Sequence, residues 1–327
     1  MFKVEIKNLK TKAHIGISEK ERLRAQPLTV TLSFKYSIAK KNQLDDIKYL
    51  KAIAKNNVTA NNLKDLRTQY DADPKQYQFL KQYLTISRAE IFFADKAVLI
   101  EGDTERILIP TFMRKVDLEE VVRLEAEGNA DTFLPLLSQN ISIIEVGAYS
   151  HIFEKFIDFL GIKSLILTDI DAIKVTGKNT KGDDVWGACP VKEGTKTSNS
   201  AIGHFLNAVT WEDLKALPVG GRTIIVGSST ICICYQQEEN TYHARSFEDA
   251  FIHLNRAFVK ENKDTFQGIK NASDFDDDEK SPYDLADKCV KKKTHFALDI
   301  LYHSDENFSN WNIPAYIKNG LLWLKED

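Results

Sequence analysis

The sequence lacks the features that mark membrane-spanning, secreted and zinc-dependent hydrolytic proteins. It contains no apolar run of about 18 residues, the length that a membrane-spanning helix needs. Residues 1–5 alternate apolar and charged side chains, whereas a signal peptide has an apolar core. The seven histidines form no H-E-x-x-H motif, so a zinc hydrolase has little support. We therefore expect a cytoplasmic protein with no membrane partner.

Cysteines are also scarce, with four in 327 residues. Cys232 and Cys234 form one C-x-C, whereas zinc sites are typically built from C-x2-C pairs. Buried reduced thiols are the simplest interpretation. A net charge of −3 argues against a coat of nonspecific DNA-binding charge, but it allows a locally basic surface around an acidic metal centre.

The chain is long enough for two ordinary domains, and its residue pattern changes along its length. Residues 1–45 contain two alternating stretches, Phe2–Ile6 and Leu28–Phe34, which predict a short β segment. Residues 46–88 are polar with apolar residues at helical spacing, so we expect a helical linker. From Ala89 onward apolar runs alternate with helical patterns, which predicts an α/β fold with a parallel sheet flanked by helices.

The candidate strands of this sheet are short apolar runs, as expected for strands that are buried on both faces: Ala97–Ile100, Ser142–Val146, Ser164–Thr168 and Thr223–Val226. Tyr149–Leu160 has apolar residues at helical spacing and is followed by Gly161, a typical helix C-cap. Strand, helix and strand together predict a βαβ unit. Residues 193–212 predict a loop followed by a helix.

Carboxylates follow two of these strands directly. Glu101 ends the first run, and Asp169 and Asp171 follow the third. Ligands in open α/β sheets bind beyond the carboxyl ends of the strands. If the chain stays extended there, Asp169 and Asp171 point to one face. Three carboxylates in one pocket would repel one another, and Mg²⁺ or Mn²⁺ removes that repulsion while preferring oxygen ligands.

Glu105 could add a further ligand, because it lies four residues after Glu101 and on the same side if a helix begins at Gly102 or Asp103. The two acidic patterns, E-G-D-T-E and D-I-D, can also be explained without a metal. The acids of E-G-D-T-E can complement a helix dipole, and D-I-D can be a polar strand end. Their occurrence at two strand ends of one sheet favours the metal site.

Two segments of the sequence resemble a motif of a known group of enzymes. Residues 91–105 and 167–171 resemble the two halves of the Toprim motif of topoisomerases, primases and the OLD (overcoming lysogenisation defect) nucleases. Residues 188–199, 245–251, 292–297 and 311–317 are similar to successive stretches of the OLD-family C-terminal region, so the likeness covers about residues 75 to 325. It implies a Rossmann-like Toprim core at 89–235 and a helical C-terminal extension at 236–327 that completes a nuclease site.

The resemblance implies a two-metal DNA nuclease that uses two Mg²⁺ or Mn²⁺ ions. Glu101, Glu105, Asp169 and Asp171 would serve one metal cluster, and Ser246 with Glu248 would serve the other. Glu101 and Lys293 would be the catalytic residues, with Lys293 near the scissile phosphate. Two cations activate the attacking water and stabilise the leaving oxygen, and a lysine offsets charge on the phosphate. This interpretation requires Glu248 to lie close to Asp169.

Some of these residues also have ordinary structural interpretations. Ser246 can be the N-cap of an amphipathic helix and Glu248 a first-turn acid, and both roles are compatible with metal binding. Thr294 can likewise cap a helix, leaving Lys291, Lys292 and Lys293 as a solvated run, and the choice between Lys292 and Lys293 stays open. Four polar residues between positions 192 and 198 could contact DNA phosphates or form an ordinary polar loop. They are Lys192, Lys196, Thr197 and Ser198.

Full-length OLD enzymes carry an ATPase domain before the Toprim domain. This sequence has no G-x4-G-K-[ST] motif, so we expect no ATP site, and either a homo-oligomer or a separate ATPase partner. Residues 1–45 instead resemble the N-terminal part of a dihydroneopterin aldolase, through Ile15-Gly16-Ile17, Glu21 and Gln26-Pro27-Leu28. The likeness stops near Asp46, and the later pterin-binding glutamate and catalytic lysine of that family find no match. We expect a truncated or recombined reading frame.

These observations predict a metal-dependent DNA endonuclease of OLD type, as found in phage defence. The alternative is a truncated, catalytically weak remnant that binds DNA or oligomerises. A pterin aldolase has less support because key groups are missing. A topoisomerase is disfavoured because no domain with a nucleophilic tyrosine is evident, and a primase because no zinc-binding module precedes the Toprim core.

Overall fold

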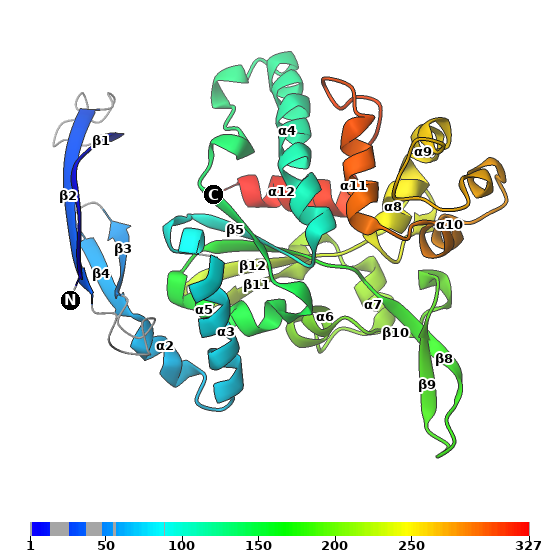
Figure 1. Ribbon diagram of the computed structural model, residues 1–327, viewed down its shortest axis with the longest axis horizontal. Helices are drawn as coiled ribbons and strands as arrows, with labels where there is room; N and C mark the ends of the chain where they lie inside the picture. Colours follow the sequence, from blue (N-terminus) through cyan, green and yellow to red (C-terminus); the bar gives the residue numbers. More distant parts are fainter. Residues whose placement is uncertain (1, 14–25, 37–47, 55–56, 88, 327) are drawn as a thin grey trace. The chain divides into compact units, whose positions relative to one another are not determined.

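The computed structural model describes residues 2–13, 26–36, 48–54, 57–87 and 89–326. The chain divides into two compact units, residues 1–68 and residues 69–327 (Figure 1). In the described part of the chain, no helix is both long enough and apolar enough to cross a membrane.

The described residues of the first unit form two antiparallel hairpins, followed by most of a short helix. Strand β1 (Phe2–Ala13) pairs with β2 (Gln26–Tyr36), and β3 (Lys48–Ala54) pairs with β4 (Asn57–Asn62). The two strands predicted within residues 1–45 are therefore confirmed. The aldolase-like pattern from Ile15 to Ala25, with Glu21, lies outside the described residues.

The prediction of helix throughout residues 46–88 is wrong for its first part, which forms β3 and β4. The asparagines and β-branched residues of β4 are poor helix formers and favour turns and strands. Helices follow only at α2 (Leu63–Gln69) and α3 (Pro74–Ser87). Asn62 ends β4, and its side-chain oxygen accepts a hydrogen bond from the backbone N–H of Lys64 at 3.0 Å, which caps α2.

The second unit is built on a five-stranded sheet with strand order β11-β12-β7-β5-β6. The strands β5 (Lys96–Ile100), β6 (Ile141–Glu145), β7 (Lys163–Leu167) and β12 (Ser229–Cys234) run parallel, and β11 (Thr223–Val226) is antiparallel to β12 at one edge. The predicted α/β fold with a mostly parallel sheet is confirmed. The sequence analysis missed β12 and therefore the antiparallel direction of β11.

Helices cover both faces of this sheet (Figure 1). On one face α4 (Asp103–Ala126) and α12 (Ala315–Lys325) pack on Val98, Ile100 and Leu165 of the strands. On the other face lies α5 (Glu154–Leu160), which ends at Gly161 in the left-handed conformation with φ of 64°. The predicted C-cap is thus confirmed, although residues 147–153 before α5 form a 3-10 turn instead of α-helix.

A second, three-stranded antiparallel sheet follows β7 and was not predicted. Its order is β10-β8-β9, formed by β8 (Ala172–Lys178), β9 (Asp184–Ala188) and β10 (Lys196–Thr197). The predicted loop and helix of residues 193–212 correspond to β10 and the two short helices α6 (Ser200–Phe205) and α7 (Trp211–Ala216).

The remainder of the chain is mainly helical, as the OLD resemblance implies. A small hairpin of β13 (Glu238–Glu239) and β14 (Tyr242–His243) precedes four helices: α8 (Phe247–Leu254), α9 (Arg256–Asn262), α10 (Pro282–Cys289) and α11 (Lys293–Tyr302). Short 3-10 turns complete the unit: Ala89–Phe93, Ala130–Thr132, Leu136–Ser138, Val191–Glu193, Val219–Arg222 and Ala272–Asp276.

An aromatic cluster fixes α8 and α11 against α4. Phe251 lies between Phe296 of α11 and Trp311, with ring centroids 5.9 and 6.0 Å away, and Phe247 contacts Phe112 of α4 at 6.1 Å. All five rings are fully buried, and burying one such side chain contributes roughly 1.5–3 kcal/mol. The cluster therefore holds the first turn of α8 close to the end of the sheet. All four cysteines are free and buried, as predicted.

Candidate metal centre

The site lies where β5 and β7 end, and its carboxylates come from the loops that follow these strands. Glu101 follows β5 directly, and Asp169 and Asp171 follow β7. The prediction that the chain stays extended through Asp171 is wrong, because Asp171 has a φ of 49° in the left-handed region. Aspartate adopts this conformation more readily than most residues, and here it turns the chain from β7 into β8.

The carboxylates nevertheless share one cleft of about 360 Å³. Six of the seven predicted site residues line it: Glu101, Asp169, Asp171, Ser246, Glu248 and Lys293. Glu248 also raises the pKa of Asp169 by charge repulsion, so the two carboxylates are close enough to interact. Asp169 and Glu248 therefore line the same cleft, and the two-metal interpretation stays a prediction.

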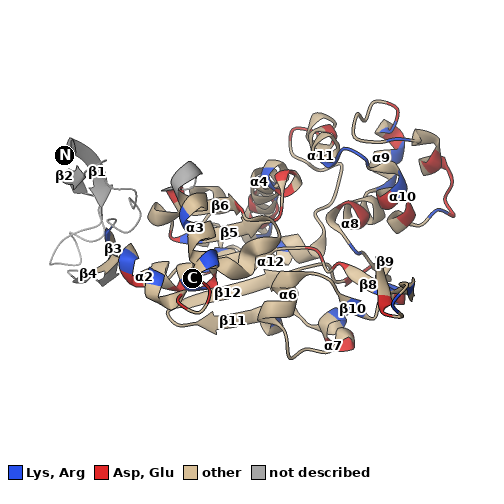
Figure 2. Ribbon diagram, turned by 60° about the horizontal axis from the view of Figure 1, so that its bottom comes forward, with Lys and Arg blue, Asp and Glu red and all other residues tan. Residues whose placement is uncertain are grey.

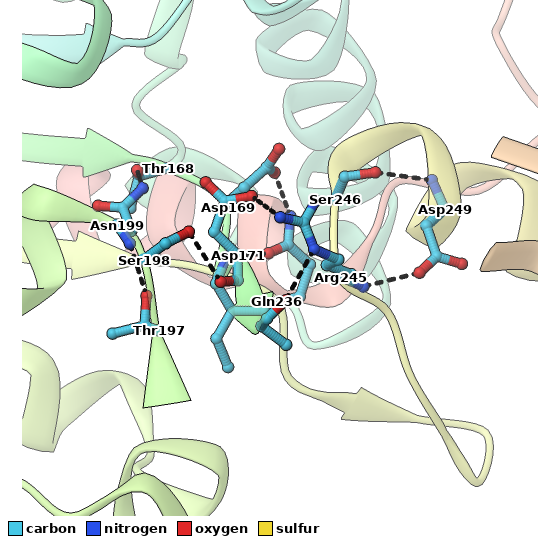
Figure 3. A network of polar contacts seen from close by, with 12 residues as sticks. Thr168, Asp169, Asp171, Thr197, Ser198, Asn199, Gln236, Arg245, Ser246 and Asp249 are labelled. Atoms are coloured by element: carbon cyan, nitrogen blue, oxygen red, sulfur yellow. Dashed lines mark hydrogen bonds and ion pairs between the residues drawn. The ribbon is translucent and has the colours of Figure 1, made fainter. Parts of the chain in front are cut away.

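Glu101 is held by two polar neighbours. It accepts hydrogen bonds from the hydroxyl of Thr168 and from Nδ2 of Asn199, the latter at 2.9 Å. Nδ2 of Asn199 also lies 2.7 Å from the Thr168 hydroxyl (Figure 3). Burial raises the pKa of Glu101, the two hydrogen bonds oppose that rise, and the charge of Asp171 adds to it. Asn199 also caps α6, so this helix positions the amide.

Asp169 is fixed by an amide and a helix N-terminus. Its Oδ1 accepts from Nε2 of Gln236 at 2.6 Å (Figure 3) and from the backbone N–H of Phe247 at 3.0 Å. Burial is the main cause that raises the pKa of Asp169 well above its usual range, and the charges of Glu101 and Glu248 raise it further. The environment therefore disfavours a negative charge here unless a cation is near.

Asp171 forms an ion pair with Arg245. Nη2 of Arg245 lies 2.8 Å from Oδ1 of Asp171, and its Nε donates to the carbonyl of Ala172 at 3.1 Å. Asp249 in turn accepts the backbone N–H of Arg245 at 2.7 Å (Figure 3). Burial raises the pKa of Asp171, and the positive charges of Arg245 and Lys293 counteract this.

Glu248 lies in the first turn of α8, with 3% of its surface exposed, and its Oε2 is 3.0 Å from Nζ of Lys293. Ser246 is the N-cap of this helix and accepts from the backbone N–H of Asp249 at 3.4 Å. The structural roles predicted for Ser246 and Glu248 are thus observed, and both residues also line the cleft.

The three consecutive lysines behave differently from one another. Lys293 lines the cleft, Lys291 donates to the carbonyl of Asp287, and Lys292 is the N-cap of α11. The prediction that Thr294 caps this helix is wrong, since the N-cap is Lys292 and α11 begins at Lys293, two residues earlier than predicted. That early start places Lys293 in the first turn, where it reaches Glu248.

Glu105 lies in the first turn of α4, where its structural interpretation places an acid, and its side chain also caps the helix. Helix α4 begins at Asp103 after the N-cap Gly102, and Oε2 of Glu105 accepts the backbone N–H of Gly102 at 3.2 Å. Among the described residues that line the cleft, Glu105 is absent. Burial, with smaller contributions from Glu248 and Glu101, raises the pKa of Glu105 to about 7.

None of the four candidate phosphate contacts is among the described residues that line the cleft. Lys192 is in the 3-10 turn before β10, and Lys196 and Thr197 form β10. Ser198 donates its backbone N–H and its hydroxyl to the carbonyl of Asp171, at 3.0 and 3.2 Å (Figure 3). Ser198 therefore supports the turn at Asp171.

The carboxylate oxygens of the cleft suit a hard divalent cation, although two of these carboxylates form ion pairs with basic side chains. Carboxylate oxygens are the ligands that Mg²⁺ and Mn²⁺ prefer. Within the described residues, however, no three carboxylate, histidine or cysteine side chains form a ready arrangement for a metal. Arg245 and Lys293 pair with Asp171 and Glu248, so direct coordination by both would require these ion pairs to open.

Sequence reasoning missed four polar residues that hold the carboxylates: Thr168, Asn199, Gln236 and Arg245. Gln236 follows β12 in the same way that Asp169 follows β7, so recognising β12 would have indicated it. Asn199 carried the ordinary signal of an N-cap before α6.

Comparison with known proteins identifies the segment that carries four of the predicted carboxylates. Residues 92–171 match the family model described as "Overcoming lysogenization defect protein-like, TOPRIM domain". The chain carries an OLD-like Toprim domain. The OLD resemblance seen in the sequence is thereby confirmed. Within the OLD-like Toprim domain lie Glu101, Glu105, Asp169 and Asp171, whereas Ser246, Glu248 and Lys293 lie beyond the matched residues.

A curated relative extends the similarity beyond the OLD-like Toprim domain. The chain is 27% identical over 260 residues to "Endonuclease GajA" from Bacillus cereus (strain HuB5-5), across 76% of this chain and 34% of that protein. The chain thus spans about a third of the length of this relative.

Similar solved structures include the C-terminal regions of two OLD proteins. That of Burkholderia pseudomallei has a TM-score of 0.40 and 18% identity, over 71% of this chain and 98% of that chain. That of Xanthomonas campestris pv. campestris has a TM-score of 0.35 and 17% identity, over 72% of this chain and 94% of that chain.

Proposed function

We propose that this chain is a divalent-metal-dependent nuclease domain of OLD type that hydrolyses phosphodiester bonds in DNA. The observation that carries the proposal is the convergence of Glu101, Asp169, Asp171 and Glu248 on one cleft that Lys293 also lines. The OLD-like Toprim domain and the similarity to an endonuclease support the same reaction class. A role in phage defence is part of this proposal.

The chemistry of the cleft supports a metal. Several buried carboxylates raise one another's pKa, and only two cationic side chains, Arg245 and Lys293, lie among the residues that line the cleft. Glu101, Asp169 and Asp171 would hold one ion, and Glu248 with the hydroxyl of Ser246 would serve a second. Bound ions of this kind lower the pKa of a water and offset charge on the phosphate oxygens.

Polar side chains of this protein orient the carboxylates that would bind metal. Asn199 and Thr168 fix Glu101, and Gln236 fixes Asp169, so that these oxygens point into the cleft with little rotational freedom. Glu105, which caps α4 beside Glu101, stays part of the proposed metal environment through its charge.

Two cationic side chains, Lys293 and Arg245, are positioned to bind a phosphate. In the absence of substrate, Lys293 and Arg245 neutralise Glu248 and Asp171. If these carboxylates bind metal, both side chains are released at the cleft, where they can pair with the scissile phosphate. Lys293 keeps 62% of its side chain exposed, so it can move without opening the fold. An ATPase partner or a homo-oligomer would supply the regulation that a whole OLD protein has.

Nicking of supercoiled plasmid in Mg²⁺ or Mn²⁺ tests the proposal. We expect the parent to convert supercoiled plasmid to open circles, EDTA to stop the reaction, and the double variant Asp169→Asn/Asp171→Asn to abolish it. The matched control is Asp276→Asn/Asp278→Asn, which removes two charges at the same spacing from exposed positions that pair with Lys263 and Lys260. No nicking by the parent, or equal nicking by parent and Asp169→Asn/Asp171→Asn, would refute the nuclease.

A further inference from the structure

A β-arm projects from the rim of the cleft, and none of the carboxylates described above lies on it. We define the arm as β8, β9 and the connecting turn, residues 172–188, together with β10. In Figure 1 the β8–β9 hairpin extends well past the helices and the main sheet, and Figure 2 shows that it carries both basic and acidic residues. Three large apolar side chains on it are exposed: Val175 by 43%, Val185 by 42% and Trp186 by 39%.

One face of the arm combines this tryptophan with a lysine. Val175 is the cross-strand partner of Trp186, and Lys196 of β10 is the partner of Ile173, two residues before Val175. The three side chains of Val175, Trp186 and Lys196 therefore share a face. Nζ of Lys196 lies 3.5 Å from the centroid of the Trp186 ring, a cation–π contact that keeps the ammonium beside the aromatic surface.

The arm is basic in a chain whose net charge is negative. Residues 172–199 contain five lysines and three acids, whereas the whole chain carries a net charge of −3. Lys174 and Lys178 are paired with Glu193 and Asp184, at 2.6 and 2.9 Å. Outside these two ion pairs the segment keeps three lysines, Lys181, Lys192 and Lys196, and one acid, Asp183, so that its net charge is +2. This charge favours a polyanion over an apolar protein partner.

The strands of the arm lead directly into the cleft. Asp171 immediately precedes β8, and Ala188 at the end of β9 lines the cleft. Beyond β10, Asn199 holds Glu101. A polymer bound in the cleft and continuing along the arm would therefore pass from the carboxylates to the face that carries Trp186.

We propose that the arm is a nucleic-acid-binding subsite in which Trp186 stacks on an unpaired base and Lys196 contacts an adjacent phosphate. The proposal rests on the proposed function, because the cleft must act on a nucleic acid. Stacking on an aromatic ring requires a base whose face is free, so the occupant is a single-stranded segment and not an intact duplex. Because every base has such a face, the subsite would be tolerant of sequence.

The binding test uses the full-length chain in EDTA, which prevents cleavage, and fluorescence anisotropy of a labelled oligothymidylate or a blunt duplex. We expect Trp186→Ala to weaken oligothymidylate binding by about tenfold, the effect of losing one stacked base. Duplex binding should be unchanged, and Trp186→Phe should retain single-strand binding. The control Tyr302→Ala removes an aromatic residue that is 84% exposed at the end of α11 and should bind as the parent does.

A second variant keeps the test independent of the tryptophan. Lys196→Gln should lower the slope of log affinity against log salt concentration by about one, as expected for the loss of one phosphate contact. Urea unfolding of each variant shows whether the fold is retained. If Trp186→Ala and Lys196→Gln both fold and bind oligothymidylate as the parent does, the subsite is refuted.

The remaining outcomes separate this proposal from competing explanations. If sedimentation shows that the parent is a dimer and Trp186→Ala a monomer, with equal affinity for oligothymidylate, a second copy of the chain occupies the face and the proposal is wrong. Nicking by the parent together with unchanged binding by Trp186→Ala refutes the arm but leaves the nuclease intact. Loss of binding in Trp186→Ala when the parent does not nick plasmid supports the arm and refutes the nuclease.

Discussion

Gln236 links the loop after β7 to the loop after β12 through Asp169. Its Nε2 donates to Oδ1 of Asp169 at 2.6 Å, and its Oε1 accepts the backbone N–H of Ile170 at 2.7 Å. Gln236 is itself almost completely buried. One amide therefore fixes both the position of a candidate metal ligand and the turn of the chain beside it.

Replacing Gln236 with leucine should weaken both stability and metal binding. The substitution leaves the N–H of Ile170 without its acceptor, a loss of about 1–3 kcal/mol in the free energy of unfolding. Removing the partner of a metal-ligating carboxylate typically lowers metal affinity roughly 10–100-fold. Urea unfolding and calorimetric Mn²⁺ titration measure the two effects. Gln267→Leu, at an exposed position, is the control, and metal affinity equal to that of this control would contradict the positioning role.

Asp169→Asn should stabilise the metal-free protein. The amide oxygen can still accept from Gln236 and Phe247, while the repulsion by Glu101 and Glu248 disappears. We expect a gain of about 1 kcal/mol in EDTA, of the size commonly obtained when a strained functional site is relieved. At a Mn²⁺ concentration of about 100 times Kd the parent gains about 2.7 kcal/mol and the variant much less. Urea unfolding with and without Mn²⁺ measures these free energies. A variant that is less stable than the parent in EDTA would contradict the claim that Glu101 and Glu248 repel Asp169.

Gly320 allows α12 to approach the sheet closely. A Cβ atom at this position would lie 3.0 Å from Sγ of Cys234 and 3.0 Å from Cδ1 of Leu165. Gly320→Val should therefore lower the free energy of unfolding by about 1–3 kcal/mol through overpacking. Gly203→Ala is the control, because a Cβ there meets no atom within 4 Å. Equal urea midpoints for the two variants would show that α12 is not packed as described.

The sequence predicted the sheet where apolar runs were isolated and bounded by clear signals. Strands β5 and β7 are such runs, and the left-handed Gly161 marks the helix end between them. The β3–β4 hairpin was missed because its residues are polar enough to fit a helical linker. Strand β12 was missed although Gly227, with a φ of 55°, signals a turn between β11 and β12.

The carboxylates of the site were predictable because they stand at strand ends, whereas their partners were not. Asp169 and Glu101 follow apolar runs directly, so their place at the sheet edge follows from topology. Gln236 and Arg245 are 67 and 74 residues away from their partners Asp169 and Asp171 in sequence. Their side chains meet only after β12 and α8 have packed on the sheet. No local pattern encodes such a contact.

The central claim is that the carboxylates of this cleft bind divalent metal. Equilibrium dialysis of the full-length chain against Mn²⁺ counts the ions that are held. The two-metal account predicts two Mn²⁺ ions per parent chain at saturation, one for Glu248→Gln, and loss of binding for Asp169→Asn/Asp171→Asn. The control Asp276→Asn/Asp278→Asn should behave as the parent does. Retention of no Mn²⁺ by the parent, or of equal amounts by the parent and Asp169→Asn/Asp171→Asn, would contradict the account.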